Sequence, residues 1–247
     1  MKSRFVVGAS ALPILFAVPA TAADMPLKAP APPVNVFSWT GFYAGVNAGG
    51  SWGRARSDLA ITGFVNTLAV TDTVNPNGAV GGGQLGYNWQ LDPNWLIGVE
   101  TDIQASGEKA SSRRFDTVDF EGVTTSYEAK IDWFGTLRGR LGYSFDRRIL
   151  VYATGGLAYG HVSLSGTSST AFLAATTPFS NAVVNTGWTV GGGVEGFAWS
   201  PRWTWKVEYL YLDLGKLNSA VTAGLTTTRA TTAFTDNVVR AGLNFHF

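Results

Sequence analysis

The stretch VRAGLNFHF, from Val239 to Phe247, alternates between two kinds of side chain. Its odd-numbered residues are apolar, and its even-numbered residues are polar or glycine. A period of two is typical of a β-strand with one apolar and one polar face. Chain ends fray unless they are tied into a larger structure, so this pattern predicts a last strand that is paired within a sheet.

The rest of the chain repeats at a fixed interval. Three short breaks separate the patterned runs: DPN from Asp92, DRR from Asp146 and SPR from Ser200, so that their starts are 54 residues apart both times. Counting back by the same interval reaches Ser38. Each unit reads as a strand, a long polar segment, a second strand and a tight turn.

This repeat predicts eight strands, near 39–53, 79–91, 95–106, 128–145, 149–164, 186–199, 203–214 and 236–247. The three tight turns then lie at one end, and four loops of roughly 20 residues lie at the other. We therefore expect an all-β fold, an eight-stranded antiparallel up-and-down transmembrane barrel with three short periplasmic turns and four long extracellular loops.

Ten charged residues fall on the polar parity of these strands. They are five acids and five bases: Glu100, Asp102, Lys130, Asp132, Arg138, Arg140, Glu195, Lys206, Glu208 and Arg240. If they face outward, they form a solvated surface around an apolar pocket, as in a soluble lipocalin-like barrel. If they face inward, they form a balanced ion network in a narrow lumen, which is the reading we favour.

Aromatic residues support the inward reading. Six of them lie on the apolar parity beside the tight turns: Trp89, Trp95, Tyr143, Phe145, Trp203 and Trp205. A ring of aromatic side chains at this position is typical of a membrane interface. A sheet edge left open in hydrocarbon would also carry unsatisfied backbone groups, so the strands must close into a barrel.

The N-terminal residues have the pattern of an export signal. Lys2 and Arg4 precede an apolar run that ends in small residues, which predicts a cleaved signal peptide over 1–23. A proline-rich lead segment over 24–38 and the barrel over 39–247 complete the predicted domains. Without Lys2 and Arg4, the 18 Lys and Arg residues fall to 16 against 17 Asp and Glu, which does not suit nucleic-acid binding.

Several stretches resemble a known family. WTGFYAGVNAGGSWG, GGGQLGYNWQ, RGRLGYSFDRRILVYATGGLAYG, GWTVGGGVEGFAWSPRWTWKVEYLYLDLG and NVVRAGLNFHF resemble the porin-like outer-membrane immunogenic proteins of alphaproteobacteria, over nearly the whole chain. The resemblance implies an eight-stranded barrel in the outer membrane of a Gram-negative bacterium, with roles in envelope integrity and host contact. Some members of the family are described as haem-binding.

The terminal residues Leu243, Phe245 and Phe247 resemble the C-terminal signal by which the barrel-assembly machinery recognises its substrates. The alternative is a plain edge strand that ends on Phe. The polar segment 107–127 carries Arg113 and Arg114, which could engage the phosphates of lipopolysaccharide. The segment 166–185 has no charge and several apolar residues, so it is a candidate for a surface that contacts a partner.

The residues offer little catalytic chemistry. The chain has no Cys and two His, His161 and His246, which fall at opposite ends of the predicted barrel, so neither a shared metal site nor a catalytic triad is expected. His161 is a weak candidate for a haem ligand. We therefore predict a non-enzymatic outer-membrane barrel, without cofactor, whose lumen is plugged by charges. The alternatives are a haem or small-ligand receptor that contacts a host surface, and a small porin.

Overall fold

A computed structural model describes residues 38–118, 121–145, 148–170, 175–223 and 225–247. The predicted signal peptide and almost all of the lead segment lie outside these residues. The described part of the chain contains nine β-strands: β1 (Gly41–Thr62), β2 (Thr67–Val74), β3 (Asn77–Gln90), β4 (Trp95–Val118), β5 (Glu121–Phe145), β6 (Ile149–Thr170), β7 (Ala175–Phe197), β8 (Trp203–Ala223) and β9 (Thr226–His246).

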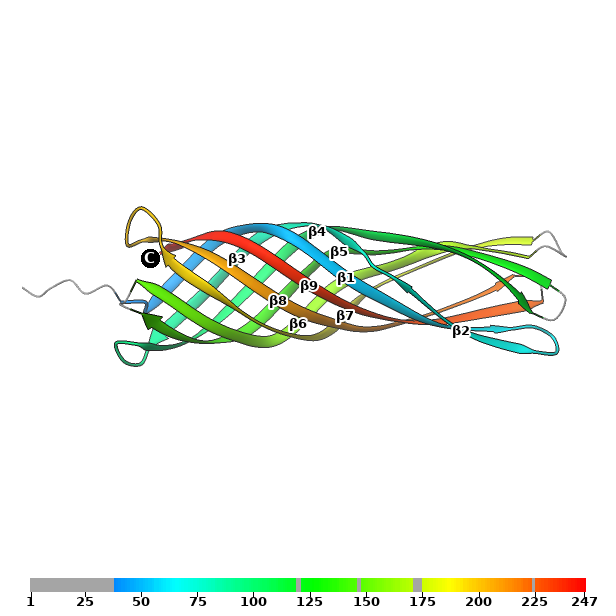
Figure 1. The fold of residues 1–247 in the computed structure, drawn as a ribbon, viewed down its shortest axis with the longest axis horizontal. Coiled ribbons are helices and arrows are strands. Elements are labelled where there is room, and N and C mark those ends of the chain that lie inside the picture. The colour runs from blue at the N-terminus through cyan, green and yellow to red at the C-terminus, as the bar shows by residue number, and fades with distance from the viewer. Residues whose placement is uncertain (1–37, 119–120, 146–147, 171–174, 224) are drawn as a thin grey trace, which may run out of the picture. The chain divides into compact units, whose positions relative to one another are not determined.

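Eight of these strands close into a barrel. Each of β3 to β8 pairs with the next strand along the chain, β1 pairs with β3, and β9 returns to pair with β1 (Figure 1). All the pairs are antiparallel. The terminal stretch Val239–Phe247 therefore supplies the closing strand, as its alternation indicates. The ninth strand, β2, pairs only with the outer part of β1.

The pairing register fixes the tilt of the strands. The row of paired residues that begins at Phe42 passes through Tyr87, Val99, Gly139, Gly155, Val190, Tyr211 and Asn237, and it returns to β1 at Trp52. Trp52 lies ten residues beyond Phe42, so the barrel has eight strands and a shear of ten. Such a barrel has a strand tilt of about 40° and an interior that side chains can fill.

The charged parity faces the interior, and the apolar parity faces outward. Leu137 is 53% exposed, whereas its neighbour Arg138 is 1% exposed. The same contrast holds along β4 and β8. An apolar exterior around a charged interior is the reverse of a soluble barrel and is the arrangement expected in a lipid bilayer. No helix among the described residues is long and apolar enough to cross a membrane.

Two aromatic girdles bound the apolar exterior. The girdle beside the turns includes the predicted pair Trp95 and Tyr143, whose ring centres are 5.2 Å apart. A second girdle, which we did not predict, lies further along the strands and comprises Trp52, Trp133, Tyr159, Trp188 and Tyr211. Ten residues of β1 separate Phe42 from Trp52, which at about 3.3 Å per residue and about 40° tilt spans about 25 Å. That is the height of the apolar band of an outer-membrane barrel.

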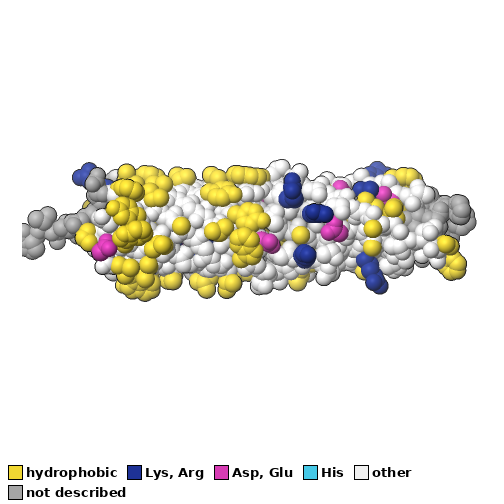
Figure 2. Space-filling view, turned by 60° about the horizontal axis from the view of Figure 1, so that its bottom comes forward, with side chains coloured by type: hydrophobic (Ala, Val, Ile, Leu, Met, Phe, Trp, Pro, Cys, Tyr) yellow, Lys and Arg dark blue, Asp and Glu magenta, His cyan; other side chains and the backbone are white. Residues whose placement is uncertain are grey.

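Charged side chains gather beyond the second girdle. Figure 2 shows most of the hydrophobic side chains over the half of the barrel that carries the turns, and most Lys, Arg, Asp and Glu residues over the other half. We call the parts of the strands beyond the second girdle the extension. The sequence-based prediction placed four long loops here. The structure instead continues the strands, and the chain reverses at short connections such as residues 63–66.

The extension is divided into two leaves. The pairing of β7 with β8 ends at Trp188 and Asp213, and that of β3 with β4 ends at Asn77 and Lys109. Beyond these points β4, β5, β6 and β7 form one leaf, and β8, β9, β1 and β2 form the other. The two groups of strands separate at the end of Figure 1 opposite the C-terminus. Two seams therefore run between the leaves, one between β2 and β4 and one between β7 and β8.

β-Bulges accompany this division. The register shifts between Ala105 and Glu108 in β4, and between Asp213 and Lys216 in β8. A bulge bends its strand and increases the local twist, so it turns β4 away from β3 and β8 away from β7. Gly215 has a φ of +74°, a left-handed conformation that glycine adopts without a Cβ clash. Its N–H is bonded to Asp213 Oδ1 at 2.8 Å, which stabilises the bulge.

Candidate functional site

Eight of the ten predicted lumen charges lie together inside the barrel. Each is less than 5% exposed, and the eight comprise four acids and four bases: Glu100, Asp102, Arg138, Arg140, Glu195, Lys206, Glu208 and Arg240. They come from β4, β5, β7, β8 and β9. Because acids and bases are equal in number, the group has no net formal charge, which reduces the electrostatic cost of burial.

Arg138 and Arg240 occupy the centre of this network. Arg138 donates from Nη1 to Glu208 Oε1 at 3.0 Å and from Nη2 to Asp102 Oδ2 at 2.9 Å, and it also bonds to Glu100. Arg240 donates from Nη2 to Asp102 Oδ2 at 2.8 Å and to Glu208 Oε2 at 2.6 Å. The two guanidinium groups thus share two carboxylates. Arg240 joins the closing strand to β4 and β8.

The other two bases extend the network towards the turns. Lys206 Nζ lies 3.0 Å from Glu100 Oε1, and Arg140 Nη2 lies 2.8 Å from Glu195 Oε2. Arg140 also donates to the hydroxyl of Tyr43 at 2.6 Å, and Tyr43 donates to Glu100 Oε2 at 2.7 Å. The guanidinium lies 3.9 Å from the ring centre of Tyr152, a cation–π contact.

Glycine makes room for the large side chains of the lumen. A Cβ on Gly86 would lie 2.3 Å from the ring of Tyr43, and a Cβ on Gly193 would lie 2.6 Å from the hydroxyl of Tyr152. Both distances are below any real carbon contact. These two glycines therefore leave the space that the two tyrosine side chains occupy.

An aromatic cap lies between the charge network and the turns. Trp39 is completely buried and packs with Leu96, Leu150 and Tyr152, and its ring stacks on Phe197 at 5.4 Å. The indole nitrogen donates to Ser144 Oγ at 3.2 Å. The sequence-based prediction placed Trp39 at the start of the first strand and did not assign it to the interior. A large side chain from the residue that follows the lead segment thus lies in the turn-side mouth.

Lys130 and Asp132 do not join the network. Both lie on the outer surface, where Lys130 pairs with Glu128 at 2.7 Å and Asp132 pairs with His161 at 2.8 Å. The register of β5 against β6 shifts between Ile131 and Trp133. Beyond an irregularity of this kind, odd- and even-numbered residues change faces of the sheet. A prediction that continues the alternation across it therefore assigns these side chains to the wrong face.

His161, the predicted haem candidate, also faces outward. Its ring stacks on Trp133 with the ring centres 6.4 Å apart, at the level of the second girdle. Nδ1 lies 2.8 Å from Asp132 Oδ2, and the side chain is about one-third exposed. The described residues contain no group of three or more His, Asp or Glu side chains that could hold a metal ion. This arrangement does not favour a haem pocket at His161.

Two further lumen acids were missed by sequence reasoning. Glu108 and Asp236 are buried near the second girdle, at 2% and 1% exposure. Glu108 lies just beyond the predicted end of its strand at residue 106, and Asp236 is the first residue of the predicted last strand. Continuing the parity of Asp102 and Gln104 by four residues would have found Glu108.

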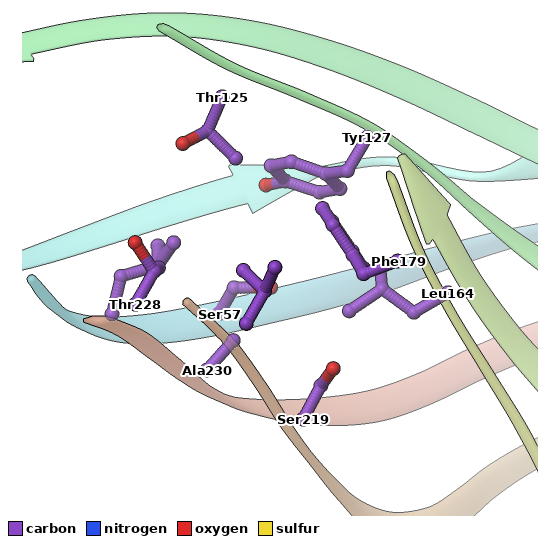
Figure 3. A pocket seen from close by; sticks show the side chains of 10 residues that line it. Ser57, Thr125, Tyr127, Leu164, Phe179, Ser219, Thr228 and Ala230 are labelled. Carbon is purple, nitrogen blue, oxygen red and sulfur yellow. The ribbon is translucent and has the colours of Figure 1, made fainter. Parts of the chain in front are cut away.

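A small apolar cavity lies between the leaves of the extension. It has a volume of about 20 Å³, and its lining residues include Leu59 and Val221 from one leaf and Tyr127, Leu164 and Phe179 from the other (Figure 3). No charged side chain lines it. The polar groups on its wall are hydroxyls, of which Ser57 Oγ lies 2.8 Å from Thr232 Oγ1.

Side-chain hydrogen bonds bridge both seams of the extension. Across the β2–β4 seam, Asp72 Oδ2 accepts hydrogen bonds from Ser112 Oγ at 2.9 Å and from the Tyr127 hydroxyl at 2.8 Å. Burial raises the pKa of the Asp72 carboxyl, but the hydrogen bonds from Tyr127, Ser112 and Thr73 N–H outweigh it and lower the pKa below the ordinary value. Across the β7–β8 seam, Asn181 Nδ2 donates to Asn218 O at 2.8 Å.

Known proteins share this sequence pattern. A family model described as an outer membrane protein beta-barrel domain matches residues 10–247. The chain is 39% identical to the 31 kDa outer-membrane immunogenic protein of Brucella melitensis biotype 1 over 253 residues, which cover all of both chains. It is 32% identical to the 22 kDa outer membrane protein of Rhizobium leguminosarum bv. viciae, over 89% of this chain and 82% of the relative.

Solved structures with similar architecture include the outer membrane protein OprG from Pseudomonas aeruginosa. It is 12% identical, with a TM-score of 0.48, over 84% of this chain and 97% of that one. The relatives are named outer-membrane proteins of Gram-negative bacteria, which agrees with the apolar exterior and its two girdles. The chain belongs to the outer membrane protein beta-barrel family, and it lies in the outer membrane of a Gram-negative bacterium.

Proposed function

We propose that this protein is a non-enzymatic barrel with a closed lumen that contributes to envelope integrity and displays its extension at the cell surface. The observation that carries the proposal is the group of eight charged side chains, each less than 5% exposed, that crosses the lumen. Arg138 and Arg240 each bond to carboxylates from both β4 and β8. The aromatic cap around Trp39 adds a second barrier on the turn side.

Conductance across planar lipid bilayers tests the closed lumen. The mature chain is expected to give no steady ion-sized openings, because bulk water has no continuous path past the network. The variant Arg138→Ala removes a large side chain from the centre and is expected to give brief openings. Leu137→Ala, on the outer face of the same strand, serves as the matched control and is expected to remain closed. Steady openings of the unaltered protein would support a small porin instead.

The surface role includes contact with lipopolysaccharide. Lys109 and Lys130 are direct cross-strand partners on the outer face of β4 and β5, just beyond the second girdle. Like charges at paired positions repel one another. Glu128 already pairs with Lys130, and a further anionic group beside Lys109 reduces the remaining repulsion. Arg54 is also exposed on the outer face beyond this girdle. Of the two arginines predicted for this role, Arg113 is exposed, whereas Arg114 is bonded to Asp116 at 2.7 Å.

Lipopolysaccharide binding tests this contact. The double variant Lys109→Gln, Lys130→Gln is expected to bind purified lipopolysaccharide several-fold more weakly than the unaltered chain, with a smaller dependence on salt. Arg202→Gln, in an exposed turn at the opposite end, is the control. Dephosphorylated lipopolysaccharide should bind both proteins equally weakly. Equal binding of the phosphorylated form by the double variant and the control would exclude this site.

A further inference from the structure

The extension contains a potential binding site that is separate from the charged lumen. Its two leaves pack face to face over apolar residues, which include Ile131 and Leu164 from one leaf and Leu217 and Phe234 from the other. We propose that the cavity between the leaves is the binding site of a small, uncharged, apolar molecule, which enters through the β7–β8 seam when the side chain of Phe179 moves aside.

The chemistry of the wall selects the ligand class. The cavity is lined by Leu59, Leu164, Val221 and aromatic rings, and its polar atoms are hydroxyls near the edges (Figure 3). A charged ligand would lose its hydration there without gaining a partner of opposite charge. Facing sheets lie about 10 Å apart, so the occupant must be slender, such as a short alkyl chain or a single aromatic ring. A haem is far too large for this space.

The seam provides the entry. Between Trp188 and the tips of β7 and β8, no backbone pairing joins the two strands. Separating them there breaks no ladder of backbone hydrogen bonds. Among the described residues, one side-chain hydrogen bond crosses this seam, from Asn181 Nδ2 to Asn218 O. Separating two strands that are paired in the sheet would break several backbone hydrogen bonds at once. The seam is therefore the part of the extension that opens most easily.

Phe179 is placed to act as the gate. It lies on β7, the strand at the edge of its leaf, and its ring packs against the buried cluster while the residue remains partly exposed. In Figure 3 its ring lies beside Leu164 and below Tyr127. The present cavity of about 20 Å³ holds no more than a water-sized group. Displacing the ring of Phe179 towards the seam both enlarges the cavity and connects it to solvent.

Tyr127 holds the opposite wall in place. Its hydroxyl donates to Asp72 Oδ2 across the β2–β4 seam, so the ring is fixed while Phe179 on the other side has only packing contacts. The site is thus rigid at one seam and able to open at the other. This inference concerns the extension alone. Conductance reports on the lumen, whereas ligand binding reports on the extension. Either proposal can therefore fail while the other holds.

The test uses the mature chain in lipid nanodiscs, with methyl-labelled Leu and Val residues observed by NMR. Hexan-1-ol is the probe, and hexane-1,6-diol is the polar control. We expect saturable shifts at the methyls of Leu164 and Val221. Leu141, which faces lipid, should shift linearly as the probe partitions into the membrane. Linear shifts at all three residues would overturn the proposal.

Two variants locate the site. Phe179→Ala is expected to bind hexan-1-ol at least threefold more tightly, because the gate is absent and the cavity is larger. Phe115→Ala, an exposed aromatic on the outer face of the extension, is the matched control and should leave binding unchanged. Ala230→Phe fills the cavity and should abolish the saturable shifts. If Ala230→Phe does not fold, Leu164→Phe serves as the cavity-filling variant in its place. Unchanged binding in both Phe179→Ala and the filled variant would refute the assignment.

Discussion

At the scale of single residues, Phe247 is proposed to act in recognition during assembly, and Asp72 is proposed to hold the two leaves together. Phe247 is exposed at 79%, and its ring contacts only Phe245 among the described aromatic residues, at 5.3 Å. Its backbone N–H is bonded to Phe42 O at 3.1 Å, a contact that any residue could make. The side chain therefore adds little to the folded state, which fits a role in recognition during assembly.

The variant Phe247→Ala tests that role. We expect its yield in the outer membrane to fall several-fold, because the proposed assembly signal of Leu243, Phe245 and Phe247 is incomplete. The protein that does insert should unfold at the same urea concentration as the unaltered chain. Phe145→Ala removes another exposed aromatic beside the turns, 53% exposed, and serves as control. If both variants insert with equal yield, the terminal Phe is an ordinary girdle residue.

Asp72 gives the extension a dependence on pH. Because the pKa of Asp72 is lowered in the folded protein, its contribution to stability is present above the unfolded value of about 3.9 and is lost as pH falls through the folded pKa. Asp72→Ala is expected to lower the free energy of opening the β2–β4 seam by about 1.5–3 kcal/mol at neutral pH, the value of hydrogen bonds to a charged group.

Hydrogen exchange of the β2 amides measures this effect. The unaltered chain should show faster exchange of β2 below about pH 4, after correction for the intrinsic rate. Asp58→Ala provides the comparison, because Asp58 is largely exposed beside Arg56 and bridges no seam. Exchange in Asp72→Ala that matches the unaltered chain at neutral pH would show that Asp72 does not hold the leaves together.

Strands and their irregularities decide where the barrel divides. The bulge at Gly215 lies where β8 leaves β7, so its left-handed conformation matters to the geometry of the seam. Gly215→Ala is expected to destabilise the protein by about 1 kcal/mol, because a Cβ is unfavourable at positive φ. Gly139→Ala, where a Cβ would contact only Gly155 O at 3.9 Å, should change stability much less. Urea titration in lipid vesicles compares the two, and equal losses would contradict this account.

The free edges of the leaves should also be visible in exchange. Amides of β7 over 175–187 that face the seam lack a partner in β8, whereas those over 188–196 are paired on both sides. We expect alternate amides in the first range to exchange at least tenfold faster than those in the second. Uniform protection along β7 would mean that the two leaves close into one continuous barrel in solution.

At the scale of the whole molecule, the barrel is a stack of layers with different chemistry. An aromatic cap lies at the turns, the charge network lies between the girdles, and an apolar core lies between the leaves of the extension. The three layers differ in the kind of side chain that fills the interior. The network connects strands far apart in the sequence, since Arg240 in β9 bonds to Asp102 in β4 at 2.8 Å.

Breaking the network should destabilise the whole barrel. Arg138→Met leaves Glu100, Asp102 and Glu208 with one base fewer and is expected to cost about 3–5 kcal/mol, the loss seen when one partner of a buried ion pair is removed. Lys130→Met removes an exposed charge on the same strand and should cost less than about 1 kcal/mol. Heat-modified gel mobility and urea unfolding measure both. Similar losses in the two variants would show that the network is not the stabilising element.

Sequence reasoning located most of the fold because its main signal is local. Alternation predicts a strand and assigns each side chain to one of two faces, and the tight turns at Asp92, Asp146 and Ser200 give the order of the strands. It was less successful in the extension, where Ser- and Thr-rich runs such as 165–170 alternate weakly and read as loops. Pairing with neighbouring strands, rather than a pattern within the segment, makes these runs β-structure.

The sequence by itself determined the eight-strand repeat and the alternation of polar with apolar residues along the strands, because these follow from residue type and spacing alone. Only the tertiary structure decided that Lys130, Asp132 and His161 face outward, that Trp39 fills the turn-side mouth and that the extension splits into two leaves. These features depend on bulges and on the register between strands. Both arise from contacts between segments that are distant in the sequence, so no pattern within one strand encodes them.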